Sequence, residues 1–283
     1  FAFGGHNDAL MVGLMLAALH AAMKRRMVLA IALTAAAIAV KPIAIVAAPF
    51  AALLFLKRET TLLQRIGAYA SAGIASIAPV ALMGMLLGVG VGWIQALTTP
   101  GSVRTWLSPA TALGMSIGLV GDVFGNRDLD ALAVSGSRML FMLAAIAICA
   151  WLLWQPRGRT SIRSAALAFT VIIGLGPVVQ PWYLLWALPL VATSGLHKAW
   201  HLKAVVLGTA GFVIYALAEP TATSDAHLDL FDSLGLLMAI AAVAAVLLAS
   251  PRERALTLGT QFAHGLQPRS SDEQQRADQW IMR

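Results

Sequence analysis

Three polar side chains in a row precede a long apolar run near the start of the sequence. His6, Asn7 and Asp8 follow the glycine pair Gly4-Gly5 and lead directly into a hydrophobic segment. Paired glycines let a backbone turn tightly, and the three side chains offer donors and acceptors for sugar hydroxyls or for a phosphate. A simpler interpretation is helix capping, because Asn and Asp are favoured at helix N-termini. Capping explains one of the three polar groups and leaves the other two without a role.

A metal site is the weaker chemical interpretation of the same residues. His6 and Asp8 are both common ligand types, but two ligands do not define a metal site. We therefore expect no metal and no other cofactor. The single cysteine, Cys149, lies within an apolar run and excludes a disulfide within the chain.

Two further positions place reactive side chains beside apolar runs. Lys41 stands between two apolar segments and is followed by Pro42. Ionisable groups at membrane depth are costly and are usually paired or functional, and a lysine there could bind a phosphate as a point charge. Gln180, Trp182 and Tyr183 belong to a Gln-Pro-Trp-Tyr run. Its rings form either an interfacial aromatic belt or a stacking wall for a sugar ring or an isoprenoid, with Gln180 binding hydroxyls.

The composition indicates which class of protein must position these residues. Hydrophobic residues make up 59% of the 283 residues and charged residues 12%, and the mean hydropathy is +0.78. Soluble domains carry about twice that share of charge, and several runs approach the roughly 20 apolar residues that cross a bilayer. The net charge of +7 does not indicate a nucleic-acid partner, because the basic residues form short clusters between apolar runs. We expect an all-α, polytopic helical bundle in the lipid bilayer.

The apolar segments and the breaks between them predict the order of the helices. We expect helices over residues 8–23, 27–40, 43–56, 66–91, 134–154, 165–179, 184–193, 204–217 and 231–249, and a surface or dipping helix over residues 109–121. The second and third segments are too short for a full crossing, so they are interpreted as a hairpin. Lys41 lies at the tip of that hairpin, and Pro42 starts its returning helix.

The distribution of basic residues predicts the orientation in the membrane. Nearly all lysines and arginines fall on one side of this arrangement, which places that side in the cytoplasm. The exceptions are Lys41, Arg104, Arg127 and Arg138. Arg104 and Arg127 are expected to be solvated loop residues, and the candidate site residues are expected to face the outside of the cell.

The chain is predicted to contain one membrane region and one polar segment. Residues 1–250 are expected to form the membrane region, and residues 251–283 a polar, poorly ordered cytoplasmic tail. Because the sequence starts at Phe1, directly beside a motif, we also expect it to be the C-terminal part of a longer protein.

Three stretches of the sequence resemble one family of membrane glycosyltransferases. They are GGHNDALMVGLMLA, the Lys41-Pro42 step and VVQPWYLLWALPL. Through them the chain resembles the actinobacterial polyprenol-phosphomannose-dependent α-(1→6)-mannopyranosyltransferases of the GT-C superfamily. The likeness extends over residues 1–250 and implies a GT-C-type helical bundle with short hairpin and interfacial helices.

The resemblance implies a reaction and its substrates. Mannose would pass, on the outer face of the membrane, from a polyprenyl-phosphate-mannose donor to an α-(1→6)-mannan glycolipid acceptor of lipomannan or lipoarabinomannan. Such enzymes invert the donor linkage, so one carboxylate acts as general base, and the departing phosphate needs charge stabilisation. The family is expected to hold its catalytic acid in a first external loop, upstream of this sequence, so the catalytic residue is unknown.

The resemblance also assigns substrate binding to particular residues. They are His6, Asn7, Asp8, Lys41, Gln180, Trp182 and Tyr183. Within this set, Asp8 is expected to position substrate and Lys41 to hold the donor phosphate, with His6 assisting it. Gln180 and the two aromatic residues are expected to shape the sugar or lipid pocket.

Two other classes of protein stay open. A secondary transporter or a lipid-carrier translocase would also be polytopic. Transporters gather polar groups near the bilayer midplane on broken and repeated helices, whereas the polar groups here gather at one face and no internal repeat is evident. A lipid-binding or scaffold subunit without chemistry would tolerate changes at His6, Asn7 and Asp8.

Overall fold

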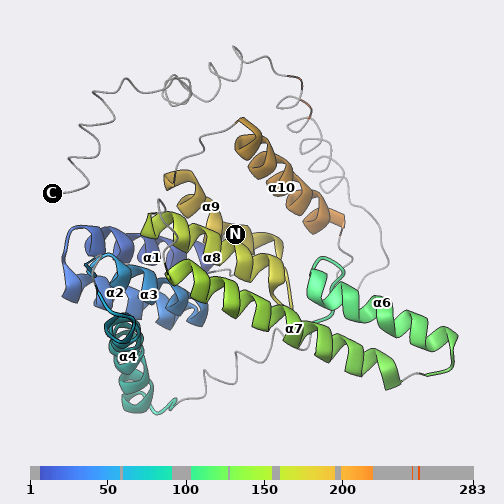
Figure 1. Cartoon of the computed structure of the whole chain (residues 1–283), viewed down its shortest axis with the longest axis horizontal. Coiled ribbons are helices and arrows are strands. Elements are labelled where there is room, and N and C mark those ends of the chain that lie inside the picture. Colours follow the sequence, from blue (N-terminus) through green and yellow to red (C-terminus); the bar gives the residue numbers. More distant parts are fainter. Residues whose placement is uncertain are drawn as a thin grey trace. The chain divides into compact units, whose positions relative to one another are not determined.

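The computed structural model describes residues 7–57, 60–90, 103–126, 128–154, 160–194 and 199–218, together with residues 244 and 248. Contacts divide the chain into two units, Phe1–Ser194 and Gly195–Arg283. Every secondary-structure element among the described residues is a helix (Figure 1). Outside the described residues lie His6, Arg127, most of the helix predicted at 231–249 and the tail predicted at 251–283.

The described helices largely follow the predicted order. Those of the first unit are α1 Asp8–Met23, α2 Met27–Val40, η1 Pro42–Val46, α3 Ala47–Leu53, α4 Leu62–Leu86, α6 Pro109–Val123, α7 Asp128–Leu153, α8 Ser161–Leu175, η3 Pro181–Tyr183 and α9 Leu184–Thr193. Here η1 and η3 are short 3-10 helices. The second unit contains α10 Ala199–Ala218, which includes the predicted residues 204–217.

α1 and α2 form a hairpin that holds two charged candidate residues at one end. Both helices have their predicted bounds, and they pack along each other. Met11 and Met15 of α1 are fully buried and lie four residues apart, on one face of the helix. The connection between the helices is the exposed basic run 24–26. Asp8 and Lys41 therefore lie at the opposite end of the hairpin.

The chain leaves α2 at Lys41 because of the proline that follows. A residue before proline avoids the helical region, and Lys41 has extended backbone angles, with φ −154° and ψ 119°. Pro42 then occupies the first turn of η1, where its missing N–H is not needed. The prediction of one continuous returning helix over residues 43–56 is wrong. Pro49 cannot donate the backbone bond of a continuous α-helix, and the segment forms η1 followed by the short α3.

α4 begins and ends earlier than the predicted residues 66–91. A capping box starts it, in which Thr61 Oγ1 accepts a hydrogen bond from Gln64 N at 3.4 Å and Gln64 Oε1 accepts one from Thr61 N at 3.0 Å. Gly88 and Gly90 follow the helix with φ values of 72° and 59°, a left-handed conformation that glycine tolerates. Apolar periodicity alone does not detect such a polar start.

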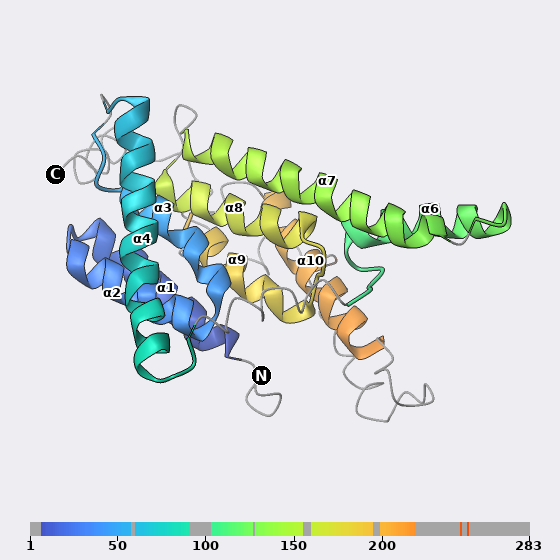
Figure 2. The same ribbon diagram turned by 90° about the horizontal axis from the view of Figure 1, so that it is seen from below.

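α6 packs lengthwise along the first half of α7, as both views show (Figures 1 and 2). Glycines allow this approach, because a side chain at Gly114 would collide with the Val134 backbone and one at Gly118 with Asp130. α6 lies where a surface helix is predicted, but α7 begins at Asp128 and not at Val134. Acidic residues suit the positive end of a helix, so the polar stretch before the predicted start forms the first turns of α7.

α8 is displaced toward the N-terminus from the predicted residues 165–179. Thr160 caps it, because its hydroxyl accepts a hydrogen bond from Arg163 N at 3.2 Å. The helix ends before Gly176-Pro177, where the residue that precedes the proline is extended. Residues 176–180 therefore form an irregular connection between α8 and η3.

Hydrogen bonds from α6 and α7 hold this connection in place. Ser108 Oγ donates to Gly176 O at 2.7 Å, and Thr111 Oγ1 donates to Pro177 O at 2.5 Å. Arg138 Nε donates to Thr111 Oγ1 at 2.8 Å. Arg138, one of the exceptions to the predicted charge distribution, thus supports the segment that leads to the Gln-Pro-Trp-Tyr run.

Arg104 lies outside the helices and is exposed, as predicted, and it also forms an ion pair. Its NH1 atom lies 2.5 Å from Asp130 Oδ2. The side chains are 48% and 30% exposed, and such exposed pairs contribute about 0–1 kcal/mol. The pair therefore joins the segment before α6 to the first turn of α7 without adding much stability.

Two of the described helices, α4 and α7, have the length and apolar composition to cross a membrane. Their large apolar side chains are mostly exposed, including Leu63, Leu86, Leu132 and Leu140. In a helix that packs against protein on all sides, these apolar side chains would be buried. Exposed apolar surface along a whole helix is unfavourable in water and suits contact with lipid.

Candidate functional site

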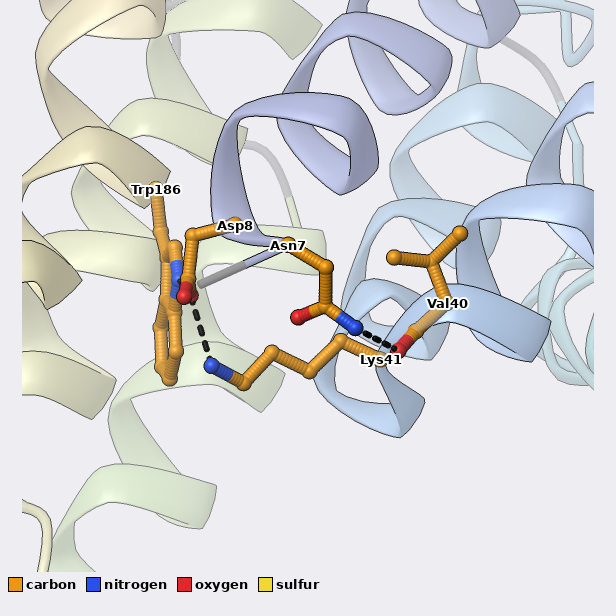
Figure 3. Close-up of polar contacts among 5 residues, drawn as sticks. All are labelled: Asn7, Asp8, Val40, Lys41 and Trp186. Carbon is orange, nitrogen blue, oxygen red and sulfur yellow. Dashed lines mark hydrogen bonds and ion pairs between the residues drawn. The ribbon is translucent and has the colours of Figure 1, made fainter. Parts of the chain in front are cut away.

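Asp8 lies at the centre of a polar cluster formed by three separate segments (Figure 3). It stands in the first turn of α1, and its side chain is fully buried. Its Oδ1 atom accepts two hydrogen bonds, from Lys41 Nζ at 2.7 Å and from Trp186 Nε1 at 2.6 Å. The end of α2, the start of α1 and the first turn of α9 therefore meet at one carboxylate oxygen.

Asn7 joins the start of α1 to the end of α2 and does not act as a side-chain cap. It occupies the N-cap position of α1, yet its side chain makes no capping hydrogen bond. Its Nδ2 atom instead donates to Val40 O at 3.1 Å. This bond satisfies one of the carbonyls that the end of α2 leaves without an intrahelical partner. The capping interpretation is therefore wrong for Asn7.

Lys41 is the part of the cluster that reaches solvent, with 27% of its side chain exposed. Its Nζ atom lies 5.5 Å from the centre of the Tyr183 ring and 5.4 Å from that of Trp186. Both distances are within the range of cation–π attraction. The two rings stack on each other with centroids 4.0 Å apart. A carboxylate and two ring faces thus hold the ammonium group.

The aromatic corner contains two of the predicted residues and one that sequence reasoning missed. Trp182 meets Tyr183 edge to face, with centroids 6.2 Å apart. Burial raises the pKa of Tyr183, and the charge of Asp8 raises it further. The phenol therefore stays protonated at neutral pH and can donate a hydrogen bond. The residue that was missed is Trp186, which lies within the helix predicted over residues 184–193 and three positions after Tyr183, and so on the same helix face.

The predicted site residues are only partly brought together. Asp8, Lys41 and Tyr183 converge, and Trp182 extends the aromatic corner. Gln180 precedes η3, where its carbonyl accepts a hydrogen bond from Tyr183 N at 2.9 Å. No hydrogen bond joins its side chain to Asp8 or Lys41.

One atom of the cluster lacks a partner. Asp8 Oδ2 is buried and accepts no hydrogen bond from any residue that the structure describes. A buried acceptor without a donor costs about 1–3 kcal/mol, and more when it is charged. Oδ2 therefore has the capacity to accept one further hydrogen bond, for example from a hydroxyl group. Within the described ranges, no three His, Cys, Asp or Glu residues are grouped so that they could hold a metal ion.

The helices and this cluster define the class of protein, and comparisons define its family. An all-helical fold with two long helices whose apolar side chains face outward is that of an all-α membrane protein. The family model of the alpha-(1->6)-mannopyranosyltransferase N-terminal domain matches residues 1–57, and that of the MptB C-terminal domain matches residues 110–249. The chain belongs to the alpha-(1->6)-mannopyranosyltransferase family. The first match contains Asp8 and Lys41, and the second contains Tyr183 and Trp186.

Individual relatives agree with the family models. The chain is 36% identical over 162 residues to an alpha-(1->6)-mannopyranosyltransferase of Mycobacterium tuberculosis, a match that covers 53% of the chain and 27% of the relative. It is 30% identical over 220 residues to alpha-(1->6)-mannopyranosyltransferase A of the same organism, covering 75% of the chain and 42% of the relative. The corresponding protein of Corynebacterium glutamicum is 30% identical over 209 residues, covering 67% and 42%. The chain thus spans less than half the length of these relatives. No solved structure matches the chain.

Proposed function

We propose that this chain forms part of a membrane enzyme that transfers mannose from polyprenyl-phosphate-mannose to an α-(1→6)-mannan glycolipid acceptor, in the synthesis of lipomannan or lipoarabinomannan. The observation that supports this most directly is the convergence of Asp8, Lys41 and Tyr183. These residues come from distant segments, and both family-matched regions contribute to the cluster. A scaffold subunit would not need a buried ion pair with an unsatisfied oxygen.

The proposed roles follow from exposure and bonding. Lys41 uses one ammonium hydrogen for Asp8 and is partly exposed, so its other donors are available to oxygens of a bound substrate. Trp182 and Tyr183 supply apolar ring surface, Gln180 is proposed to bind hydroxyls, and His6 is proposed to assist Lys41. Asp8 Oδ1 is already held by two donors, so Asp8 is proposed to position substrate and is not assigned as the general base.

The reaction itself requires groups that the described residues do not supply alone. Inversion at the transferred sugar needs a carboxylate that removes the proton of the acceptor hydroxyl. The leaving phosphate develops charge, which cations or hydrogen-bond donors stabilise. We propose that residues 1–250 form the membrane region that binds the substrates, and that the base lies outside this chain.

The orientation is proposed from the two ends of the α1–α2 hairpin. The basic run 24–26 lies at one end, and Asp8 and Lys41 lie at the other. A helix of the length of α1 extends about 24 Å, most of the roughly 30 Å of the hydrocarbon core, so the two ends of the hairpin would lie near opposite faces of the membrane. Because basic clusters favour the cytoplasm, we propose a multi-pass protein with the cluster on the external side and residues 251–283 on the cytoplasmic side.

Thiol labelling in intact cells tests this orientation. In a Cys149→Ser background, Ala39→Cys places a thiol beside the cluster, and Lys24→Cys places one in the basic run. Both positions are exposed in the fold. A membrane-impermeant maleimide is expected to label Ala39→Cys in intact cells, and Lys24→Cys only after permeabilisation. Labelling of both positions from the same side, or the reverse pattern, would contradict the proposed topology.

A transfer assay tests the activity. Membranes that contain the full-length protein are expected to move mannose from polyprenyl-phosphate-mannose to an α-(1→6)-linked mannoside, and to use no nucleotide sugar directly. The linkage of the product is measured by its digestion with a linkage-specific mannosidase. Absence of transfer, together with saturable uptake of a solute into vesicles, would instead support the transporter class.

A further inference from the structure

We propose that the Asp8–Lys41 pair binds two neighbouring hydroxyl groups of a hexose. Asp8 Oδ2 accepts a hydrogen bond from one hydroxyl, and Lys41 Nζ donates to the oxygen of the next. This inference rests on the proposed function and assigns the ligand chemistry of the same site. It replaces the expectation that Lys41 holds the donor phosphate.

The first argument is that the two carboxylate oxygens of Asp8 differ in their hydrogen bonds. Oδ1 accepts hydrogen bonds from Lys41 at 2.7 Å and from Trp186 at 2.6 Å. Oδ2 is equally buried and accepts none from the described residues. Buried polar atoms are almost always satisfied by protein, water or ligand. A sugar hydroxyl is a donor of the required kind, because it can give its proton to Oδ2 while its oxygen accepts from another group.

The second argument is charge. Asp8 and Lys41 together carry no net charge, and their ion pair is largely removed from solvent, with side-chain exposures of 0% and 27%. A phosphate bound to Lys41 would place its negative charge beside the carboxylate, where like charges repel strongly at low dielectric. A pair of neutral hydroxyls meets no such repulsion. It also uses the unsatisfied acceptor of Asp8 and the remaining donors of Lys41.

The third argument concerns Trp186, which acts as a positioning residue. It is 5% exposed, and its indole N–H holds Asp8 Oδ1. With Oδ1 held by two donors, the carboxylate cannot exchange its two oxygens by rotation without breaking both bonds. Oδ2 is thereby kept as the free acceptor. The stacked ring of Tyr183 in turn fixes the indole plane.

The test measures protection of Lys41 from acylation in the full-length protein in its own membranes. An N-hydroxysuccinimide ester is added, and the modified peptides are quantified by mass spectrometry. Saturating α-(1→6)-dimannoside, as the acceptor source, or polyprenyl-phosphate-mannose, as the donor source, is expected to slow acylation of Lys41 at least about tenfold. Lys57, which is exposed and outside the cluster, is the internal control and should not be protected.

Three comparisons separate the hydroxyl site from an anion site. Deoxy methyl mannosides that lack one hydroxyl of the bound pair should protect Lys41 less well than methyl mannoside itself. The concentration needed for equal protection should be about tenfold higher or more, because one hydrogen bond is lost. Trp186→Phe keeps an aromatic ring but loses the N–H donor, and it should reduce this discrimination between parent and deoxy sugars. Inorganic phosphate, and polyprenyl phosphate without a sugar, should not protect Lys41.

The outcomes distinguish this inference from the proposed function. Protection by phosphate alone, equal protection by every deoxy sugar, or full discrimination in Trp186→Phe would each overturn the hydroxyl assignment. Because protection does not require turnover, these results can be obtained even if no mannosyl transfer is detected. Absence of transfer together with normal protection by mannosides would reject the proposed reaction and leave the hydroxyl site standing.

Discussion

Lys41→Met is expected to reduce mannosyl transfer by about 100-fold or more in the full-length enzyme, without preventing membrane insertion. The substitution keeps the bulk of the side chain but removes the cation from the buried carboxylate of Asp8. The variant cannot donate to a bound substrate, and a lost hydrogen bond of a charged donor costs about 1.5–3 kcal/mol. Because 1.36 kcal/mol in a barrier is tenfold in rate, the upper value alone corresponds to about 100-fold, and the uncompensated carboxylate disturbs the site further. The measurement is the initial rate of transfer, with the amount of inserted protein determined by immunoblotting of carbonate-washed membranes.

A double variant separates loss of function from loss of structure. Asp8→Asn also removes half of the pair, and it too should reduce transfer. Combining Asp8→Asn with Lys41→Met removes both charges, so the thermal stability in detergent should recover relative to either single variant while transfer stays low. Lys57→Met changes an exposed lysine outside the cluster and should leave both properties unchanged. Normal transfer by both single variants would remove the functional interpretation of the cluster.

Gly114→Ala is expected to destabilise the protein by about 1–3 kcal/mol, the usual cost of overpacking a closely packed contact. An added Cβ at this position would lie 2.7 Å from Val134 N and 2.6 Å from Ser137 Oγ. The backbone of α7 cannot move away without separating it from α6. Because Thr111 and Ser108 of the α6 region hold residues 176 and 177, the substitution should also disturb the aromatic corner and reduce transfer.

Gly136→Ala is the matched control for this effect. It lies on the facing helix α7, and an added Cβ there meets no atom within 4 Å. Alanine has a higher helix propensity than glycine by about 1 kcal/mol, so this variant should be at least as stable as the parent. The measurement is the unfolding temperature of both variants in the same detergent. Equal destabilisation by the two substitutions would show that close packing between α6 and α7 is not the cause.

Local sequence patterns were sufficient for the class of protein and for most of the helices. The low charge and the apolar runs predict an all-α membrane protein, and α1, α2 and α9 have the predicted bounds. The break at Lys41 was also predictable, because the conformation of a residue before proline is decided by that proline. Errors occurred where polar residues start helices, as at Thr61 and Asp128. Apolar periodicity begins several residues after such a start.

The cluster could be predicted only in its members and not in its contacts. Sequence reasoning selected Asp8, Lys41 and Tyr183 by residue type and by their position beside apolar runs. It did not pair Asp8 with Lys41. It also left out Trp186, which lies 178 positions after Asp8 along the chain. Residue type and spacing describe one segment at a time. The topology expected from the basic clusters placed these helix ends at one membrane face, but it did not give the contacts between them.

The sequence by itself therefore determined the membrane class, the order of the helices and the polar residues available at their ends. Only the tertiary structure decided that one oxygen of Asp8 is shared between a lysine and an indole while the other has no partner among the described residues. The physical reason is that helices form through hydrogen bonds between residues a few positions apart. A buried carboxylate instead takes its partners from whichever helices pack around it, and that packing depends on the shapes of many side chains at once.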